Sequence, residues 1–347
     1  MKRKGTLSVV LGLICSFCIS CQKTPPVAAP SPAQSEPPKI QIGMLFDTFV
    51  LERWLKDRDV FVATATSLGA EVNVQNANGV IEEQIKQMEY LIEKKVDVIV
   101  IIATDTNSQE LRDLIADAKM KGIKVIAYDR LIEKANVDFY ISFNNPRVGE
   151  LMAEAVLERV PATAKIAAIY GAPTDYNVPQ VKSGVYKVLE RHGAKLIYEA
   201  WADNWKAEYA FEYTNECIDR MGQVDAIICG NDALAAQAFK ALSERRLADK
   251  VILVGQDADI DACQRIVGGN QYMTVYKSIN ALAKQAAGYA VSLAQGKALN
   301  TKQRISDGSY DIPYCYLEPI AVTKENMDSV IIDSQFHFKD DVYLYAE

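Results

Sequence analysis

The sequence contains little histidine and no excess of positive charge. Only His192 and His337 occur among 347 residues, which leaves little scope for histidine-based catalysis or metal binding. Lysine and arginine number 38 against 45 aspartates and glutamates, so the formal net charge is −7. A nucleic-acid-binding protein needs a basic face, and this balance argues against one. The composition, 49% hydrophobic and 24% charged, is ordinary for a globular protein, and the length predicts about two domains.

Three common enzyme motifs are missing. No two glycines stand two positions apart, which excludes the G-x-G of dinucleotide-binding folds. The chain has neither a G-x-x-x-x-G-K-[ST] phosphate loop nor a G-x-S-x-G nucleophile elbow. His192 lies at a predicted helix end and His337 lies between two phenylalanines, so neither follows a strand. We therefore expect no catalytic residue, no cofactor and no metal, and a protein that is not an enzyme.

The N-terminus has the pattern of a signal peptide over residues 1–20. Three positive residues, 2–4, precede an apolar run from Leu7 to Ile19, which is too short to span a bilayer. The following Cys18-Ile-Ser-Cys21 resembles a bacterial lipobox, with Cys18 where leucine is usual, and predicts lipidation of Cys21. Residues 21–38 are rich in proline, alanine and serine, a composition that predicts a flexible, lipid-anchored tether. The alternative is a metal or iron–sulfur site, because Cys15, Cys18 and Cys21 spell C-x-x-C-x-x-C.

Four cysteines remain beyond the tether: Cys217, Cys229, Cys263 and Cys315. A location outside the cytoplasm permits disulfides. Cys229 lies in an apolar run, however, so a buried free thiol is an equally acceptable interpretation.

From residue 39 onward, apolar strand-like runs alternate with segments of helical spacing. Ile81, Ile85, Met88 and Ile92 recur on one helical face, and the run 96–102 is almost wholly apolar, as expected of a strand buried on both faces. This alternation predicts βαβ units and a mostly parallel sheet. The order then repeats at offsets of 124 to 128 residues, which indicates two similar Rossmann-like α/β lobes. The paired runs are 39–46 and 165–170, 71–75 and 195–198, 96–102 and 224–228, and 124–128 and 250–254.

Polar residues follow these strands. Ligands of open α/β sheets bind beyond the carboxyl ends of the strands, so two facing rims predict a polar cleft between the lobes. Carboxylates there could serve acid–base chemistry or merely cap helices. Arg130, Asn231 and Lys277 favour binding, because they neutralise carboxylates and donate hydrogen bonds. The strand-end residues are Asp47, Thr104, Asp105, Asp129, Arg130, Asp175, Asn231, Asp232 and Asp257.

This set of residues suits a sugar. Each sugar hydroxyl both donates and accepts, so it can bridge a carboxylate and a cation or amide. The apolar C–H face of a pyranose packs on an aromatic ring. Trp54 and Trp205 lie in loops predicted to face the cleft, whereas we interpret Trp201 as a core or surface aromatic.

Residues 39–336 resemble the bacterial D-xylose-binding proteins, within the pentose and hexose group of type I periplasmic sugar-binding proteins. The Glu-Arg-Trp and Thr-Val-Tyr-Lys segments are the most specific part of the resemblance. The segments that carry it are Leu51–Asp59, Val74–Gly79, Ala127–Arg130, Asp138–Phe143, Gly255–Ala258 and Met273–Lys277.

The resemblance implies a sugar site made of ten residues. Asp129 and Arg130 would hold adjacent hydroxyls, and Trp54 and Trp205 would enclose the sugar ring. Tyr176 stands where the family pattern has asparagine, so it either points away or narrows the pocket, and the exact sugar stays open. The segment after Phe338 also departs from the family. The implied contacts are Arg53, Trp54, Asp129, Arg130, Asp175, Asn177, Trp205, Asn231, Asp257 and Lys277.

The resemblance also implies an organisation and a role. It places an N-terminal lobe at 39–144 plus 278–311 and a C-terminal lobe at 145–277 plus 312–338, joined by a three-crossover hinge. It implies a monomer outside the cytoplasm that hands a monosaccharide to the permease of an ABC importer. The lipobox pattern predicts that a lipid anchors this protein to the membrane. The alternative is a sugar sensor that docks on a membrane histidine kinase or chemoreceptor. A hydrolase is disfavoured by the missing motifs, and a sugar-responsive DNA regulator by the signal peptide.

Overall fold

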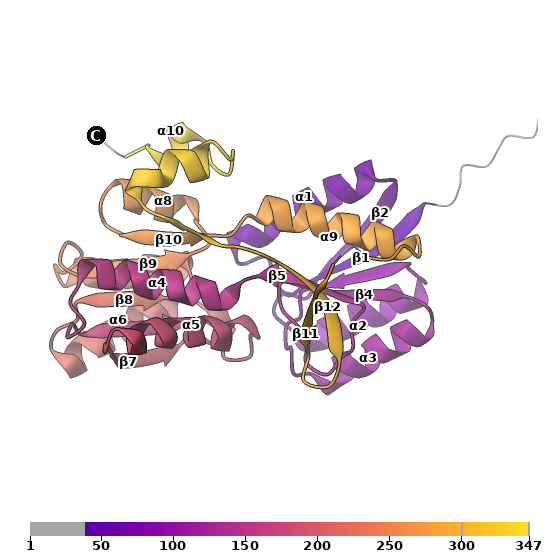
Figure 1. Cartoon of the computed structure of the whole chain (residues 1–347), viewed down its shortest axis with the longest axis horizontal. Coiled ribbons are helices and arrows are strands. Elements are labelled where there is room, and N and C mark those ends of the chain that lie inside the picture. Colours follow the sequence, from indigo (N-terminus) through magenta and orange to yellow (C-terminus); the bar gives the residue numbers. More distant parts are fainter. Residues whose placement is uncertain (1–38, 300, 346–347) are drawn as a thin grey trace, which may run out of the picture. The chain divides into compact units, whose positions relative to one another are not determined.

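Two sheets divide the chain into two lobes (Figure 1). The computed structural model describes residues 39–299 and 301–345. The predicted signal peptide, the alternative cysteine cluster, Cys21 and the tether lie outside the described residues. Within them, no helix is both long enough and apolar enough to cross a membrane.

The N-terminal lobe has a seven-stranded sheet in the order β11-β12-β5-β4-β3-β1-β2. All neighbouring strands are parallel except β11 and β12. Its elements are β1 (Ile40–Phe46), α1 (Glu52–Ser67), β2 (Ala70–Asn76), α2 (Ile81–Glu93), β3 (Val98–Ile101), α3 (Gln109–Met120), β4 (Lys124–Tyr128), β5 (Phe139–Phe143), α9 (Ile279–Ala294), β11 (Gln303–Ser306) and β12 (Asp311–Leu317).

The C-terminal lobe has a six-stranded sheet in the order β13-β10-β9-β8-β6-β7, with β13 antiparallel to β10. Its elements are α4 (Asn145–Arg159), β6 (Ile166–Tyr170), α5 (Asn177–Arg191), β7 (Leu196–Trp201), the 3₁₀ turn η1 (Asp203–Trp205), α6 (Glu208–Met221), β8 (Ala226–Cys229), α7 (Asp232–Glu244), β9 (Ile252–Gln256), α8 (Ile260–Val267), β10 (Met273–Tyr276), β13 (Ile320–Val322), η2 (Lys324–Asn326), η3 (Asp328–Ile332) and α10 (Lys339–Val342).

The predicted repetition is confirmed by the strand order. The arrangement β2-β1-β3-β4-β5 of one lobe corresponds to β7-β6-β8-β9-β10 of the other. Helices cover both faces of each sheet, which is why the strands are apolar throughout: Met44 of β1 packs towards α1 and α9, and Leu45 packs towards α2 and α3. In the C-terminal lobe, α4 and α5 cover one face and α6 and α7 the other.

The chain passes between the lobes three times. The first two passages follow β5 near Asn144 and β10 near Lys277. The third was expected at 311–313, but β12 pairs with β5 as far as Leu317, so the chain crosses after that residue. The predicted boundary between 311 and 312 is therefore wrong. Strand β12 covers the edge of β5, and Tyr314 stacks on Tyr140 with ring centroids 4.9 Å apart.

Two glycines bring helices α4 and α5 into close contact. A Cβ atom on Gly149 would lie 1.9 Å from the carbonyl oxygen of Val181, and one on Gly184 would lie 1.9 Å from that of Pro146. The first residues of these helices, Asn145 and Asn177, are consequently neighbours, with the Nδ2 of Asn145 donating to the Oδ1 of Asn177 at 2.8 Å.

The C-terminal segment packs on the C-terminal lobe outside the repeat. Met327, Ile331, Phe336 and Val342 are buried against α8 and β10.

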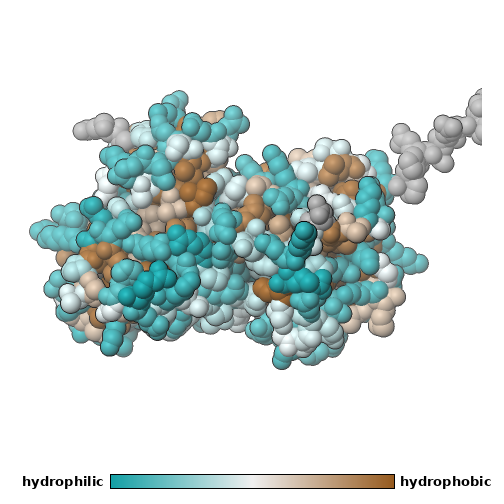
Figure 2. Space-filling model, viewed as in Figure 1, coloured by the Kyte–Doolittle hydropathy of each residue, from teal (hydrophilic) through white to brown (hydrophobic). Residues whose placement is uncertain are grey.

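All four cysteines of the described part of the chain are free thiols. Of the two interpretations of these cysteines, the structure therefore shows the one without disulfides. Figure 2 shows hydrophilic residues over most of one face of the molecule.

Candidate functional site

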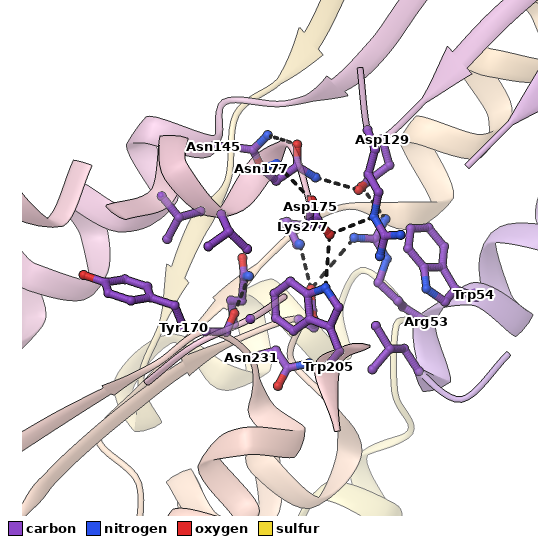
Figure 3. A pocket seen from close by; sticks show the side chains of 18 residues that line it. Arg53, Trp54, Asp129, Asn145, Tyr170, Asp175, Asn177, Trp205, Asn231 and Lys277 are labelled. Atoms are coloured by element: carbon purple, nitrogen blue, oxygen red, sulfur yellow. Dashed lines mark hydrogen bonds and ion pairs between the residues drawn. The ribbon is translucent and has the colours of Figure 1, made fainter. Parts of the chain in front are cut away.

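All ten predicted contact residues line one pocket (Figure 3). They come from the two lobes and from the crossover after β10. Asp129 follows β4, Asn231 follows β8 and Asp257 follows β9, so the carboxyl ends of both sheets meet here. Sequence reasoning missed eight further lining residues: Leu51, Asn145, Tyr170, Gly171, Val178, Val181, Gly230 and Gln256.

Arg53, near the start of α1, is the centre of one group of charges. Its guanidinium is only 6% exposed and reaches Asp129 at 2.9 Å, Asp57 at 3.3 Å and Asp257 at 4.0 Å. Burial alone would lower the pKa of Arg53, but the three carboxylates outweigh it and raise the pKa above its ordinary value. Arg53 therefore stays charged and presents fixed donors to the pocket.

Arg130 is the centre of a second group of charges, and it contacts carboxylates of both lobes. Its Nη1 donates to Asp47 of the N-terminal lobe at 2.7 Å and to the carbonyl of Ala103 at 3.0 Å. Its Nε lies 2.7 Å from Asp175 of the C-terminal lobe. Burial by itself would lower the pKa of Arg130, but the negative charges of Asp175 and Asp47 have the larger effect, so its pKa is raised above the ordinary value.

Asp129 accepts from both lobes. Arg53 donates to one carboxylate oxygen at 2.9 Å, and Asn177 donates to the other at 2.8 Å. Burial would raise the pKa of Asp129, yet Arg53, Lys277 and Arg130 outweigh it and the pKa is lowered. Asp129 is therefore an ionised acceptor rather than a proton shuttle.

The tryptophans occupy different surroundings. Trp54 is 2% exposed, and the Arg53 guanidinium lies 4.2 Å from the centre of its ring. The Nε1 of Trp205 donates to Asp175 at 3.1 Å. Its ring lies so close to the backbone of Gly171 that a Cβ there would be 2.1 Å from it. Trp201 does not line the pocket and packs against Tyr170 in the lobe core, as interpreted from the sequence.

Three pocket residues have a left-handed backbone that sequence reasoning did not foresee. The φ angles are 65° for Asp129, 57° for Trp205 and 99° for Asp257. Residues other than glycine adopt such angles at a cost, and they persist where surrounding contacts hold them. The backbone here serves to direct these side chains into the pocket.

Tyr176 does not line the pocket. Its ring packs edge-on against Tyr140 of the N-terminal lobe, with centroids 6.3 Å apart. Of the two sequence alternatives, the structure shows the one in which Tyr176 points away and does not narrow the pocket.

His192 ends α5, and its Nδ1 lies 2.9 Å from the carbonyl of Val188. Among residues 39–299 and 301–345, no group of His, Cys, Asp or Glu is arranged to hold a metal ion.

Asp57 and Tyr128 form a buried layer behind Arg53. The carboxylate of Asp57 accepts from the Arg53 Nε and from the Tyr128 hydroxyl, and both residues are 0% exposed. The spacing of Arg53 and Asp57, four residues apart on a helix, is a signal that could have found this pair. The layer fixes the direction of the guanidinium.

Asp57 should produce a distinct pH dependence of stability. Burial raises its pKa to about 6 from an ordinary value of 3.8, although Arg53 and Tyr128 oppose this. The folded chain then holds more protons on this group than the unfolded chain, so the stability that it contributes is lost as the pH rises from about 4 to about 6. The difference in unfolding free energy between the wild type and Asp57→Asn should fall by about 2 kcal/mol over that range.

Urea unfolding of both proteins at stepped pH measures this difference. Asp59→Asn, on the same helix, is the matched control, because Asp59 is exposed and paired with Arg58. A constant difference between the wild type and Asp57→Asn from pH 4 to 6 would contradict the expectation.

Two α/β lobes whose strand ends face a shared polar pocket define the class of type I periplasmic binding proteins. A family model described as "Periplasmic binding protein domain" matches residues 42–298. The chain is 42% identical to the D-xylose-binding periplasmic protein of Haemophilus influenzae, over 99% of this chain and 100% of that protein. It is also 42% identical to the D-xylose-binding periplasmic protein of Escherichia coli K12, over 86% of this chain and 91% of that one.

A solved structure shares the fold. The ABC transporter solute-binding protein of Clostridium phytofermentans, solved with β-D-glucose, superposes with a TM-score of 0.79 and 26% identity, over 87% of this chain and 99% of that one. The chain therefore belongs to the periplasmic binding protein family, in the group that contains the D-xylose-binding proteins.

Proposed function

We propose that this protein binds D-xylose, or a close monosaccharide, between its lobes and delivers it to an ABC importer. The convergence of all ten predicted contact residues on one pocket carries the proposal. The names of the two relatives at 42% identity support xylose as the sugar, and the solute-binding structure with glucose supports a transport role.

The charge of the pocket favours a neutral polar ligand. Its lining holds three cations, Arg53, Arg130 and Lys277, and three carboxylates, Asp129, Asp175 and Asp257. Each of these cations lies within 3 Å of a carboxylate, since Lys277 is 2.8 Å from Asp257. The carboxylates of the pocket would repel an anionic ligand. A sugar hydroxyl, in contrast, can donate a hydrogen bond to a carboxylate and accept one from a cation.

The remaining contacts complete a sugar site. The Oδ1 of Asn231 accepts from the backbone N–H of Leu234 at 2.9 Å and caps α7, so its amide nitrogen is the group that can donate to a hydroxyl. Leu51, Val178 and Val181 add apolar surface, and the rings of Trp54 and Trp205 can cover the C–H face of a pyranose.

We propose that the lobes close on the sugar as a hinge at the three crossings. The contacts of Arg130 with Asp47 and Asp175, and of Asp129 with Asn177, join the lobes. A second pocket adjoins the first and shares Arg130, Asp175 and Trp205 with it, which suggests the side from which the sugar enters. A permease that contacts both lobes would recognise the closed state.

We further propose an extracytoplasmic monomer, anchored through lipidated Cys21 and the tether. The names of the periplasmic relatives support the compartment. The Lys2-Arg-Lys4 start and the Cys18–Cys21 pattern are the basis for the signal peptide and the anchor.

Calorimetry with a panel of sugars tests the ligand. Protein that has been unfolded and refolded to remove any bound sugar is titrated with D-xylose, D-ribose, L-arabinose, D-glucose and the anion D-xylonate. We expect one site, with D-xylose tightest and D-xylonate not bound. Absence of binding to every neutral monosaccharide would overturn the proposal.

Co-purification from detergent-solubilised membranes tests delivery. Permease subunits should be recovered with the protein, and more of them in the presence of xylose. Recovery of a histidine kinase in their place would replace transport by sensing and leave the sugar assignment intact.

A further inference from the structure

We infer that His337, in the C-terminal segment outside the repeated lobes, is a positioning residue that holds Asp257 in the sugar pocket. This inference rests on the proposed function, because it assigns His337 a role through one of the proposed sugar contacts.

Asp257 lies in a turn that needs support. Asp257 and Ala258 both have a left-handed backbone, with φ angles of 99° and 56°. Such angles are unfavourable for both residue types and persist only where neighbours hold them. The turn places the Asp257 carboxylate 2.8 Å from the Nζ of Lys277 and 4.0 Å from the Nη1 of Arg53.

The two amides of the turn are held by β10. The N–H of Asp257 donates to the carbonyl of Val275 at 2.9 Å, and the N–H of Ala258 donates to the Oγ1 of Thr274 at 3.2 Å. Thr274 in turn donates to buried Asp232 at 2.6 Å. These bonds fix one side of the turn.

The carbonyl of Ala258 is held from the other side by His337. The Nε2 of His337 lies 2.7 Å from this oxygen, and since a carbonyl can only accept, the proton is on Nε2. Ala258 is 0% exposed and His337 is 9% exposed, so water does not readily replace this bond. Among the described residues, the Sγ–H of Cys263, a weak donor, also lies 3.6 Å from this oxygen.

The neighbouring Phe336 packs the same segment against residues that lie next to two other pocket residues in the chain. Its ring packs against Tyr276, directly before Lys277, with centroids 4.9 Å apart. The Nζ of Lys56 lies 4.4 Å from the centre of the Phe336 ring, and Lys56 is one helical turn after Arg53 on α1. The segment, which lies over α8 in Figure 1, therefore contacts the elements that carry Asp257, Lys277 and Arg53.

A matched pair of amide substitutions tests the role of His337. Glutamine places its Nε2 close to the histidine Nε2, whereas asparagine is one methylene shorter and does not reach the carbonyl. We expect His337→Asn to weaken D-xylose binding about ten-fold, because a buried carbonyl loses its donor and the turn loosens. His337→Gln should stay within about two-fold of the wild type. His192→Leu, at the end of α5, is the control and should bind normally.

A double-mutant cycle separates positioning from general destabilisation. In an Asp257→Asn background, where the ionised carboxylate is already lost, His337→Asn should weaken xylose binding much less than in the wild type. The same ten-fold loss in both backgrounds, or no loss in the wild type, would overturn the inference. Unchanged binding by Asp257→Asn alone would instead show that the proposed pocket contact is wrong.

Thermal unfolding of every variant checks the fold. His337→Leu keeps apolar contact with Phe336 and gives a second variant without a donor, should His337→Asn not fold. If both of these variants fail to fold while His337→Gln folds, His337 serves the fold rather than Asp257, and the inference is overturned.

Discussion

Asp129→Ala should weaken D-xylose binding by about 2–5 kcal/mol, because it removes one partner of a buried, hydrogen-bonded charge pair. Arg53, which donates to Asp129 at 2.9 Å, would lose its closest carboxylate, and Asn177, which donates at 2.8 Å, would lose its link to the other lobe. A sugar hydroxyl bound at this point would also lose its acceptor. Calorimetry with xylose measures the loss.

Asp105→Ala is the matched control for this substitution. Asp105 also follows a strand of the N-terminal lobe, but its carboxylate accepts from the N–H of Asn107 at 2.8 Å and does not line the pocket. It should bind xylose as the wild type does. If Asp129→Ala bound xylose as tightly as Asp105→Ala, the assigned pocket would be wrong.

Gly171→Ala should weaken xylose binding by about 3 kcal/mol without a change at any proposed contact residue. The new Cβ would lie 2.1 Å from the Trp205 indole, so the ring must leave its position. Its apolar contact with the sugar and its hydrogen bond to Asp175 would both be lost. Trp205→Ala should lose a similar amount, and the double variant should lose little more than either single one.

Gly288→Ala, on α9, is the control for this second substitution. A Cβ at Gly288 meets nothing within 4 Å, so binding and fold should be retained. Near-UV circular dichroism should report the displaced tryptophan in Gly171→Ala and not in the control. Wild-type affinity in a Gly171→Ala protein with a displaced ring would exclude Trp205 as a sugar contact.

Much of the fold was determined by local pattern. The strands of both lobes are readable because they are buried on both faces and so carry apolar runs such as Val98–Ile101. The repeat of those runs predicted the shared strand order. The helix α2 was readable from Met88 and Ile92, which are buried on one face.

The polar part of the pocket was also largely predicted from the sequence, whereas eight further lining residues were not. Side chains that follow parallel strands gather at one edge of a sheet whatever the details of packing, which places Asp129, Asn231 and Asp257 together. Resemblance to a family supplied residues that the strand-end rule does not reach, such as Arg53 and Asn177, which lie at the starts of helices α1 and α5.

Only the tertiary structure decided how these side chains are held. Tyr128 is hydrogen-bonded to Asp57, His337 to the carbonyl of Ala258, and the Trp205 ring packs on Gly171. These pairs join residues far apart in the chain, and no local pattern encodes them. The same holds for the third crossing, since β12 continues to Leu317 because it pairs with β5. Tyr176 likewise leaves the pocket because Tyr140 of the other lobe offers it an aromatic contact. Local sequence specifies which surfaces are apolar and where strands end, whereas the direction of a side chain depends on the neighbours that folding brings to it.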